Sequence, residues 1–220
     1  MKIKNLYTAN RHFPILSVTV AAVCCLITVT VLVKPEWYPA LAWKYPADNT
    51  WQHFGGVFLH GTSDGSAAMA AVHLSANLLM FLPFSIMIEK SIGHAKFGFA
   101  FLTSWLGAAL VFMIVAAAIS NGKEAYGAGL SSVSYSMITI GCTILLRILL
   151  MDKKRFFRQP LAYVFLGGMV CELAMLNPYI AGIGSFILHL SGIFVGSILS
   201  IAFRKAIKES LIKAQCMSVS

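Results

Sequence analysis

Residues 129–150 read GLSSVSYSMITIGCTILLRILL, an apolar run that opens on glycine and serine and carries one charge, Arg147. A helix needs about 20 residues to cross the hydrocarbon core of a bilayer. This stretch is therefore long enough and apolar enough to span a membrane. The whole chain agrees with that prediction. Of its 220 residues, 58% are hydrophobic and 11% are charged, which leaves too little polar surface to cover a water-soluble globule.

Five further apolar segments have the length of a membrane span, separated by charged or proline-containing segments. They cover residues 14–33, 67–88, 98–119, 161–177 and 184–203. The first is longer than the apolar core of a cleaved signal peptide, about 7–15 residues, so we expect it to be retained. We predict an all-α membrane protein, a polytopic bundle of six transmembrane helices over residues 14–203. A short segment, 1–13, precedes this bundle, and a basic tail, 204–220, follows it.

The basic residues are distributed unevenly between the two sides of the predicted membrane spans. If the N-terminus is cytoplasmic, 14 of the 17 lysines and arginines lie on the cytoplasmic side, and only Lys34, Lys44 and Lys123 lie outside. This asymmetry is typical of membrane topology, so the net charge of +9 requires no nucleic-acid partner. The sequence thus predicts cytoplasmic N- and C-termini and the lipid bilayer as partner. None of the five cysteines forms a CxxC pair, so we expect no disulfide framework, metal site or cofactor.

Polar residues at membrane depth are costly and often functional. His73 and Asn77 stand four residues apart, on one helical face. Ser131 follows Gly129 at the start of a span, and His189 stands on a face cleared of bulk by nearby glycines. Each feature alone also fits a structural role. The His73–Asn77 pair and His189 suit hydrogen bonds between helices, and the serine suits helix capping or packing.

Together these motifs resemble the rhomboid family of intramembrane serine proteases. The resemblance covers about residues 14–203, in order and with a consistent topology. The matching residues are His73 and Asn77 followed by Glu89 and Gly93, then Gly129, Ser131 and Tyr135, then His189, Gly192 and Gly196, with Trp51 and His60 in the first outer loop.

The resemblance implies a Ser–His dyad that hydrolyses peptide bonds of transmembrane protein substrates. Ser131 would be the nucleophile and His189 the base, with Tyr135 packed against the imidazole. His73 and Asn77, with the Ser131 N–H, would stabilise the oxyanion. Substrates would enter laterally from the bilayer past a mobile region at about 161–183, and the membrane would be the inner membrane of a bacterium.

Three positions depart from the family pattern. Gln52 replaces the usual arginine, so a charge that anchors the outer loop is missing. Ser132 replaces the glycine that usually follows the nucleophile, and the segment 61–72 is longer than in typical members. These departures bear on loop structure and substrate preference more than on the dyad.

Other functions remain open at this point. A non-catalytic rhomboid-like scaffold would share the fold but would normally lack the serine or the histidine. A rhombosortase-like protease would process C-terminal sorting signals with the same residues. A small transporter or channel would use His73, Glu172 and His189 as a proton path, and Glu172 also suits a position facing water or headgroups.

The charge asymmetry gives a direct test of topology. A cysteine introduced near Asp48 should react with a membrane-impermeant thiol reagent from the outer side only. Labelling of that site only from the cytoplasmic side would contradict the predicted orientation.

Overall fold

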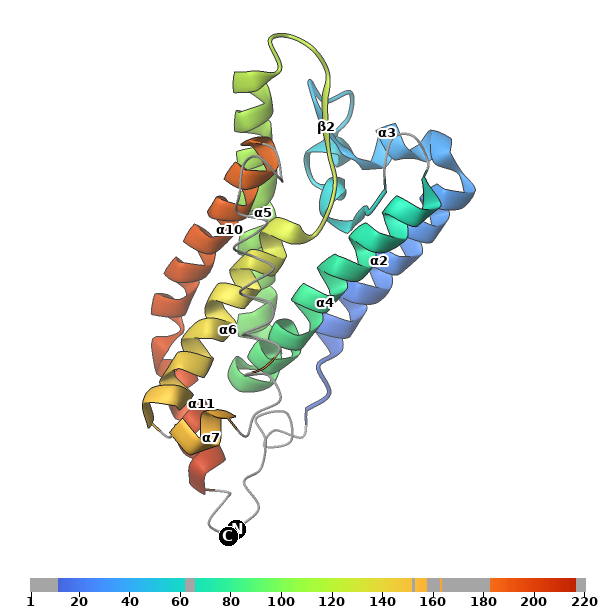
Figure 1. The fold of residues 1–220 in the computed structure, drawn as a ribbon. Helices are drawn as coiled ribbons and strands as arrows, with labels where there is room; N and C mark the ends of the chain where they lie inside the picture. Colours follow the sequence, from blue (N-terminus) through green and yellow to red (C-terminus); the bar gives the residue numbers. More distant parts are fainter. Residues whose placement is uncertain (1–11, 62–65, 152, 158–162, 164–182, 217–220) are drawn as a thin grey trace.

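The computed structural model describes residues 12–61, 66–151, 153–157, 163 and 183–216. Within these ranges, five helices are long and apolar enough to span a membrane (Figure 1). They are α2 (Ile15–Val33), α4 (Ala67–Ile92), α5 (His94–Ile119), α6 (Ser131–Met151) and α10 (Ile183–Ala202). The prediction of a polytopic helical membrane protein is confirmed. The expected span 161–177, with Glu172, lies outside the described residues except for Tyr163, so the count of six stays a prediction.

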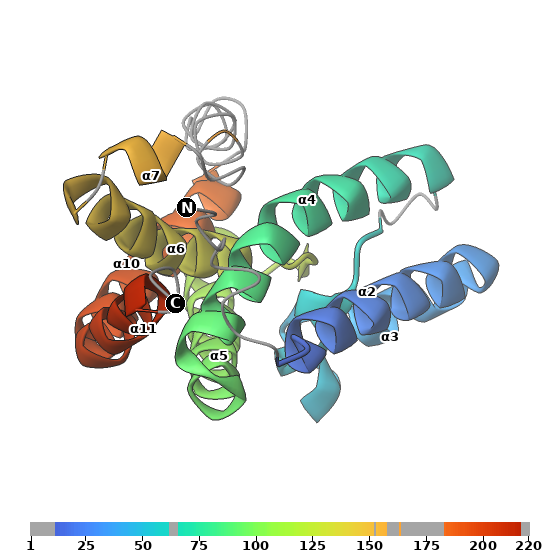
Figure 2. The ribbon, with the colours of Figure 1, turned by 90° about the horizontal axis from the view of Figure 1, so that it is seen from below.

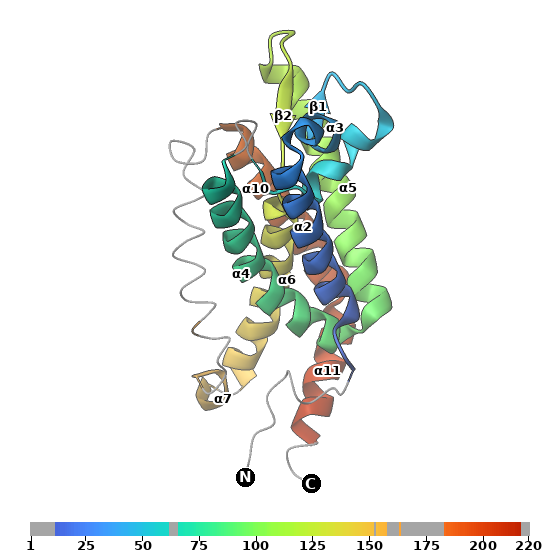
Figure 3. The same cartoon turned by 90° about the vertical axis from the view of Figure 1, so that its right-hand side faces the viewer.

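Shorter elements lie at the two ends of this bundle (Figures 1 and 3). One end, here called the loop end, holds β1, β2 and the short helices before α4, whereas α7 and α11 lie at the opposite end. The elements of the loop end are η1 (Pro35–Trp37), α3 (Tyr38–Leu41), β1 (Trp43–Tyr45), η2 (Thr50–His53), η3 (Gly55–Phe58) and β2 (Ala125–Gly127). Those of the opposite end are α7 (Lys153–Phe157) and α11 (Arg204–Cys216), so part of the expected basic tail is helical.

The helices α4 and α5 are longer than the spans expected at 67–88 and 98–119. Each has 26 residues, and one residue, Gly93, separates them. Gly93 has φ +85°, a conformation that favours glycine, so the helix ends there and the chain turns back. The apolar run ends before the charged Glu89, so the sequence predicted that the span ends at residue 88. In the structure that carboxylate is buried with partners, and the helix continues past it.

The helix α6 is the central element of the bundle. Of its most apolar stretch, 61% is buried, compared with 28–33% for the other four spans. It packs against α4, α5 and α10, and the view along the bundle in Figure 2 shows α2 on the far side of α4 from α6. The residues of α6 are thus held in place by three neighbouring helices.

The buried carboxylate of Glu89 joins α4 to the start of α2. It accepts hydrogen bonds from the Leu16 N–H (2.9 Å), the Ser17 N–H (2.8 Å) and the Ser17 hydroxyl (2.6 Å). A further contact, from α5, is that of His94 Nδ1, 2.6 Å from the same carboxylate. The first N–H groups of a helix have no partner within it and carry partial positive charge. Glu89 therefore caps α2 from a neighbouring helix.

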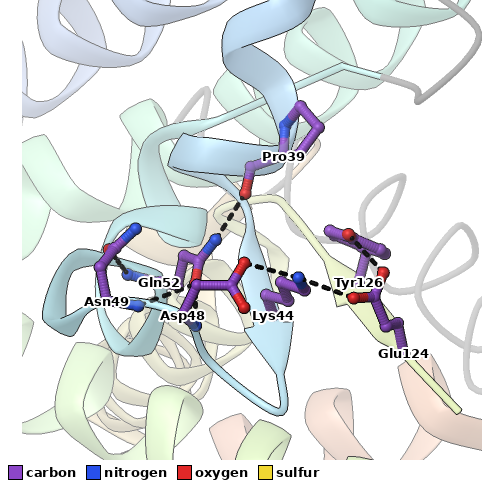
Figure 4. Close-up of polar contacts among 7 residues, drawn as sticks. All are labelled: Pro39, Lys44, Asp48, Asn49, Gln52, Glu124 and Tyr126. Carbon is purple, nitrogen blue, oxygen red and sulfur yellow. Dashed lines mark hydrogen bonds and ion pairs between the residues drawn. The ribbon is translucent and has the colours of Figure 1, made fainter.

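At the loop end, an ion-pair network around Lys44 joins the two strands (Figure 4). The Lys44 ammonium lies 2.6 Å from Asp48 and 2.8 Å from Glu124, while its side chain is only 8% exposed. These bonds raise the pKa of Lys44 and lower the pKa of both carboxylates. Because Lys44 lies opposite Tyr126 in the antiparallel β1–β2 pair, the network fixes β2 against the loop that precedes α4.

Gln52, the residue found in place of the family arginine, is also part of this loop structure. It is 2% exposed, and its side-chain oxygen accepts from the N–H groups of Asp48 (2.6 Å) and Asn49 (3.2 Å). Its amide nitrogen donates to the Pro39 carbonyl at 2.9 Å. The expectation that a loop-anchoring charge is missing holds for position 52 alone, because Lys44 supplies a buried cation eight residues earlier.

The contacts of Glu89 predict a stability effect. Glu89→Gln leaves one acceptor oxygen and turns an NH₂ group toward the N–H and hydroxyl donors. The free energy of unfolding should therefore fall by about 1–3 kcal/mol, and the melting temperature in detergent should fall with it. The matched control is Glu36→Gln, because Glu36 is exposed in η1 and should tolerate the change. A Glu89→Gln protein that melts with the wild type would contradict the proposed capping.

Candidate active site

The candidate nucleophile and base meet at the loop end of α6. Ser131 is the first residue of α6, and its Oγ lies 3.2 Å from Nε2 of His189 on α10. His189 is 4% exposed, whereas Ser131 is partly accessible. A hydroxyl within hydrogen-bond reach of an imidazole nitrogen is the geometry that activates a serine.

Close packing of two backbones makes this contact possible. A Cβ on Gly192 would collide with the Ser132 carbonyl oxygen, and a Cβ on Gly196 would lie 2.6 Å from the Ser136 carbonyl oxygen. Both glycines therefore permit α10 to lie directly on α6, one and two turns from His189. The Ser132 hydroxyl adds a bond to the Leu188 carbonyl at 2.8 Å. The serine found in place of the family glycine thus contributes to the α6–α10 contact.

Tyr135 lies one turn along α6 from Ser131, against His189. The two rings are stacked, with centroids 4.4 Å apart and planes inclined by 24°. Tyr135 is 1% exposed, so its ring cannot move without repacking the bundle. The imidazole plane is therefore fixed by a neighbouring aromatic surface.

The α4 residues approach the same point from the other side. Gly129 has φ +121°, and a Cβ there would lie 2.8 Å from Nε2 of His73, so the His73 ring is packed against the turn before Ser131. Asn77 is 4% exposed and donates from Nδ2 to the His73 carbonyl at 3.0 Å. That bond uses one of the two N–H groups of the amide. The second is left for another acceptor.

His60 is a residue of this site whose position the sequence analysis did not predict. It is fully buried, and its Nε2 accepts a hydrogen bond from the Leu130 N–H at 3.1 Å. Its ring meets the His73 ring edge-on at 5.2 Å between centroids. Burial, and then the neighbouring His73, lower the pKa of His60 to about 3. The only signal in the sequence was its spacing from Trp51, which indicated a loop motif and not a contact with residue 130.

A cavity of about 260 Å³ lies beside Ser131. Apolar residues of α5 and residues 125–129, which precede α6, both line this cavity. The residues that line it include Trp43, Phe112, Val115, Ala116, Ile119, Gly127, Gly129, Ser131, Gly184 and Leu188. Space for small groups is thus present next to the candidate nucleophile. Among the described residues, no cluster of three or more His, Cys, Asp or Glu could hold a metal ion.

The comparison with protein families decides the family of the chain. A family model described as the rhomboid domain matches residues 47–206. This chain belongs to the rhomboid family. The match contains every candidate site residue, from His73 to His189. A search of curated proteins found no significant match. The rhomboid family consists of serine intramembrane proteases that act on membrane proteins within the bilayer.

The α6–α10 contact predicts different outcomes for two glycine substitutions. Alanine improves helix propensity by about 0.8–1 kcal/mol at an exposed position. At Gly98 of α5 a Cβ would touch only the Leu16 side chain, at 3.4 Å, so Gly98→Ala should keep or raise the melting temperature. Gly192→Ala should lower the melting temperature and cost about 1–3 kcal/mol of unfolding free energy, because the clash is with backbone. Equal melting temperatures in detergent for the two variants would contradict this packing.

Proposed function

We propose that this rhomboid protein is an intramembrane serine endopeptidase, which cleaves transmembrane or membrane-proximal segments of other membrane proteins through a Ser131–His189 dyad. The observation that carries the proposal is the 3.2 Å contact between Ser131 Oγ and His189 Nε2 at the start of α6. Nucleophile and base are within the reach that proton transfer needs.

In the proposed reaction, His189 Nε2 takes the hydroxyl proton as Ser131 Oγ attacks the carbonyl carbon of the substrate. The imidazolium then gives this proton to the leaving amine, and the C–N bond breaks to leave an acyl-enzyme. Water deprotonated by the same imidazole hydrolyses that ester and restores Ser131. Tyr135 acts as a positioning residue, since its stacked ring keeps the imidazole oriented.

The oxyanion would form at the positive end of the α6 dipole. Ser131 is the first residue of that helix, and the first N–H groups of a helix have no intrahelical partner. We assign the Ser131 N–H, His73 and the second N–H of Asn77 as donors. Donors placed where charge develops are often the largest contribution to catalysis.

The contacts of His189 favour this function over the two non-proteolytic alternatives. A scaffold has no need of a serine hydroxyl against a buried imidazole, and a proton path through His189 gives no role to the stacked Tyr135. A rhombosortase-like protease would use the same dyad, so substrate identity decides between the two proteolytic functions.

The orientation proposed from charge gives each end of the bundle a side. The loop end, with β1 and β2, would face the outside, and α7 and α11 would face the cytoplasm. From the resemblance to the rhomboid family, we also place the protein in a bacterial inner membrane. The region expected to admit substrate, 161–183, lies outside the described residues except for Tyr163 and Ile183, the latter being the first residue of α10.

A fluorophosphonate probe tests the nucleophile. Purified wild-type protein in detergent should be labelled at Ser131, and Ser131→Ala should show no labelling above that of heat-denatured protein. His189→Ala should also lose labelling, because the hydroxyl is then not activated.

The matched control is Ser132→Ala, which removes the adjacent hydroxyl and its bond to the Leu188 carbonyl. This variant should still be labelled. Loss of labelling in Ser132→Ala, with labelling retained in Ser131→Ala, would reassign the nucleophile. The melting temperature of each variant should be measured, so that loss of labelling through unfolding is recognised.

A further inference from the structure

We infer that His60 is a positioning residue for the Ser131 nucleophile, a role that rests on the proposed function: by accepting the Leu130 N–H, it fixes the backbone turn that aims the Ser131 N–H and hydroxyl.

The turn before α6 is held by two consecutive backbone amides. The Gly129 N–H donates to the Gly56 carbonyl at 2.8 Å, and the Leu130 N–H donates to His60 Nε2 at 3.1 Å. Both acceptors belong to one segment of the first outer loop, residues 56–60. Two adjacent anchors leave the peptide plane between them little freedom. The direction of the next N–H group, that of Ser131, is therefore set by the outer loop.

His60 is the partner of a buried amide. His60 and Leu130 are both fully buried, so bulk water does not compete with the imidazole for the Leu130 N–H. A neutral imidazole has one donor and one acceptor nitrogen. Because Nε2 accepts, the ring is neutral with the proton on Nδ1, and burial, which lowers the pKa of His60, favours the neutral ring.

His60 also contacts the α4 side of the site. Its ring meets His73 edge-on, and His73 in turn packs against Gly129. The same imidazole therefore touches the turn that carries the nucleophile and a proposed oxyanion donor. Loss of His60 would alter the relative placement of these two groups.

This arrangement also narrows the set of oxyanion donors. The Leu130 N–H is engaged by His60, so it is not free to bind a carbonyl oxygen. Ser131 then supplies the backbone donor. His60 thus selects which amide faces the reacting group.

Three variants separate positioning from simple core packing. His60→Phe keeps a ring and removes the acceptor. His60→Gln places an amide oxygen at about the reach of Nε2, whereas His60→Asn carries the same amide one methylene shorter. The rate of fluorophosphonate labelling at saturating probe should fall about 10- to 100-fold for His60→Phe and His60→Asn, with little change in probe affinity. His60→Gln should recover most of that rate.

A second measurement follows the bond itself. Hydrogen–deuterium exchange of the peptide that contains Leu130 should quicken in His60→Phe and His60→Asn and stay slow in His60→Gln. A structural filler would instead give rates that follow melting temperature alone, with His60→Asn equal to His60→Gln, and that result would overturn the inference. If wild-type protein is labelled at Ser131 and His60→Phe is labelled as fast, only the role of His60 fails. If wild-type protein is not labelled at all, the proposed function fails and this role with it.

Discussion

The structure depends on the backbone contact between α6 and α10 at Gly192 and Gly196. In lipid, apolar surface gives helices little reason to associate, so close van der Waals packing of small residues has to hold them together. A Cβ at either glycine would meet a carbonyl oxygen of α6, which a side-chain rotation cannot relieve. The separation of the two helices is thus set by backbone. This short separation of α6 and α10 allows the 3.2 Å contact between Ser131 Oγ and His189 Nε2.

A second constraint comes from the irregular chain before α6. Backbone groups that leave regular structure near the bilayer must find partners inside the protein. Gly129 and Leu130 find them in Gly56 and His60 of the loop that precedes α4, and β2 finds them in β1. The Lys44 ion pairs with Asp48 and Glu124 add a side-chain connection between the same segments. Because these carboxylates are exposed, each pair contributes modestly, and their combined effect is to fix which loops meet.

The sequence predicted the spans and the motif residues, which depend on local pattern. It could not predict contacts between residues far apart in the chain. Apolar length located the five described spans to within a few residues, apart from the ends of α4 and α5 at Gly93. The motifs around His73, Ser131 and His189 identified residues that the fold brings together. The contacts of Lys44 with Glu124 and of His60 with Leu130 join residues 70 or more positions apart. No periodicity in one sequence encodes such pairs. At Gln52, which replaces an arginine, the sequence predicted the loss of a loop-anchoring charge. The structure places the buried cation of Lys44 in the same loop.

The place of Ser131 at the first position of α6 follows from the chemistry proposed for it. A serine in the middle of a helix has its N–H bonded to the carbonyl four residues earlier, so it cannot offer that group to an oxyanion. At the first position the N–H is free of the helix, and the dipole favours negative charge. The same position lies beside a cavity at the loop end, where water can approach, while the rest of α6 is buried among helices whose other faces are apolar. Moving the serine one turn deeper would keep a hydroxyl near α10 but remove the donor, the dipole and the access to water together.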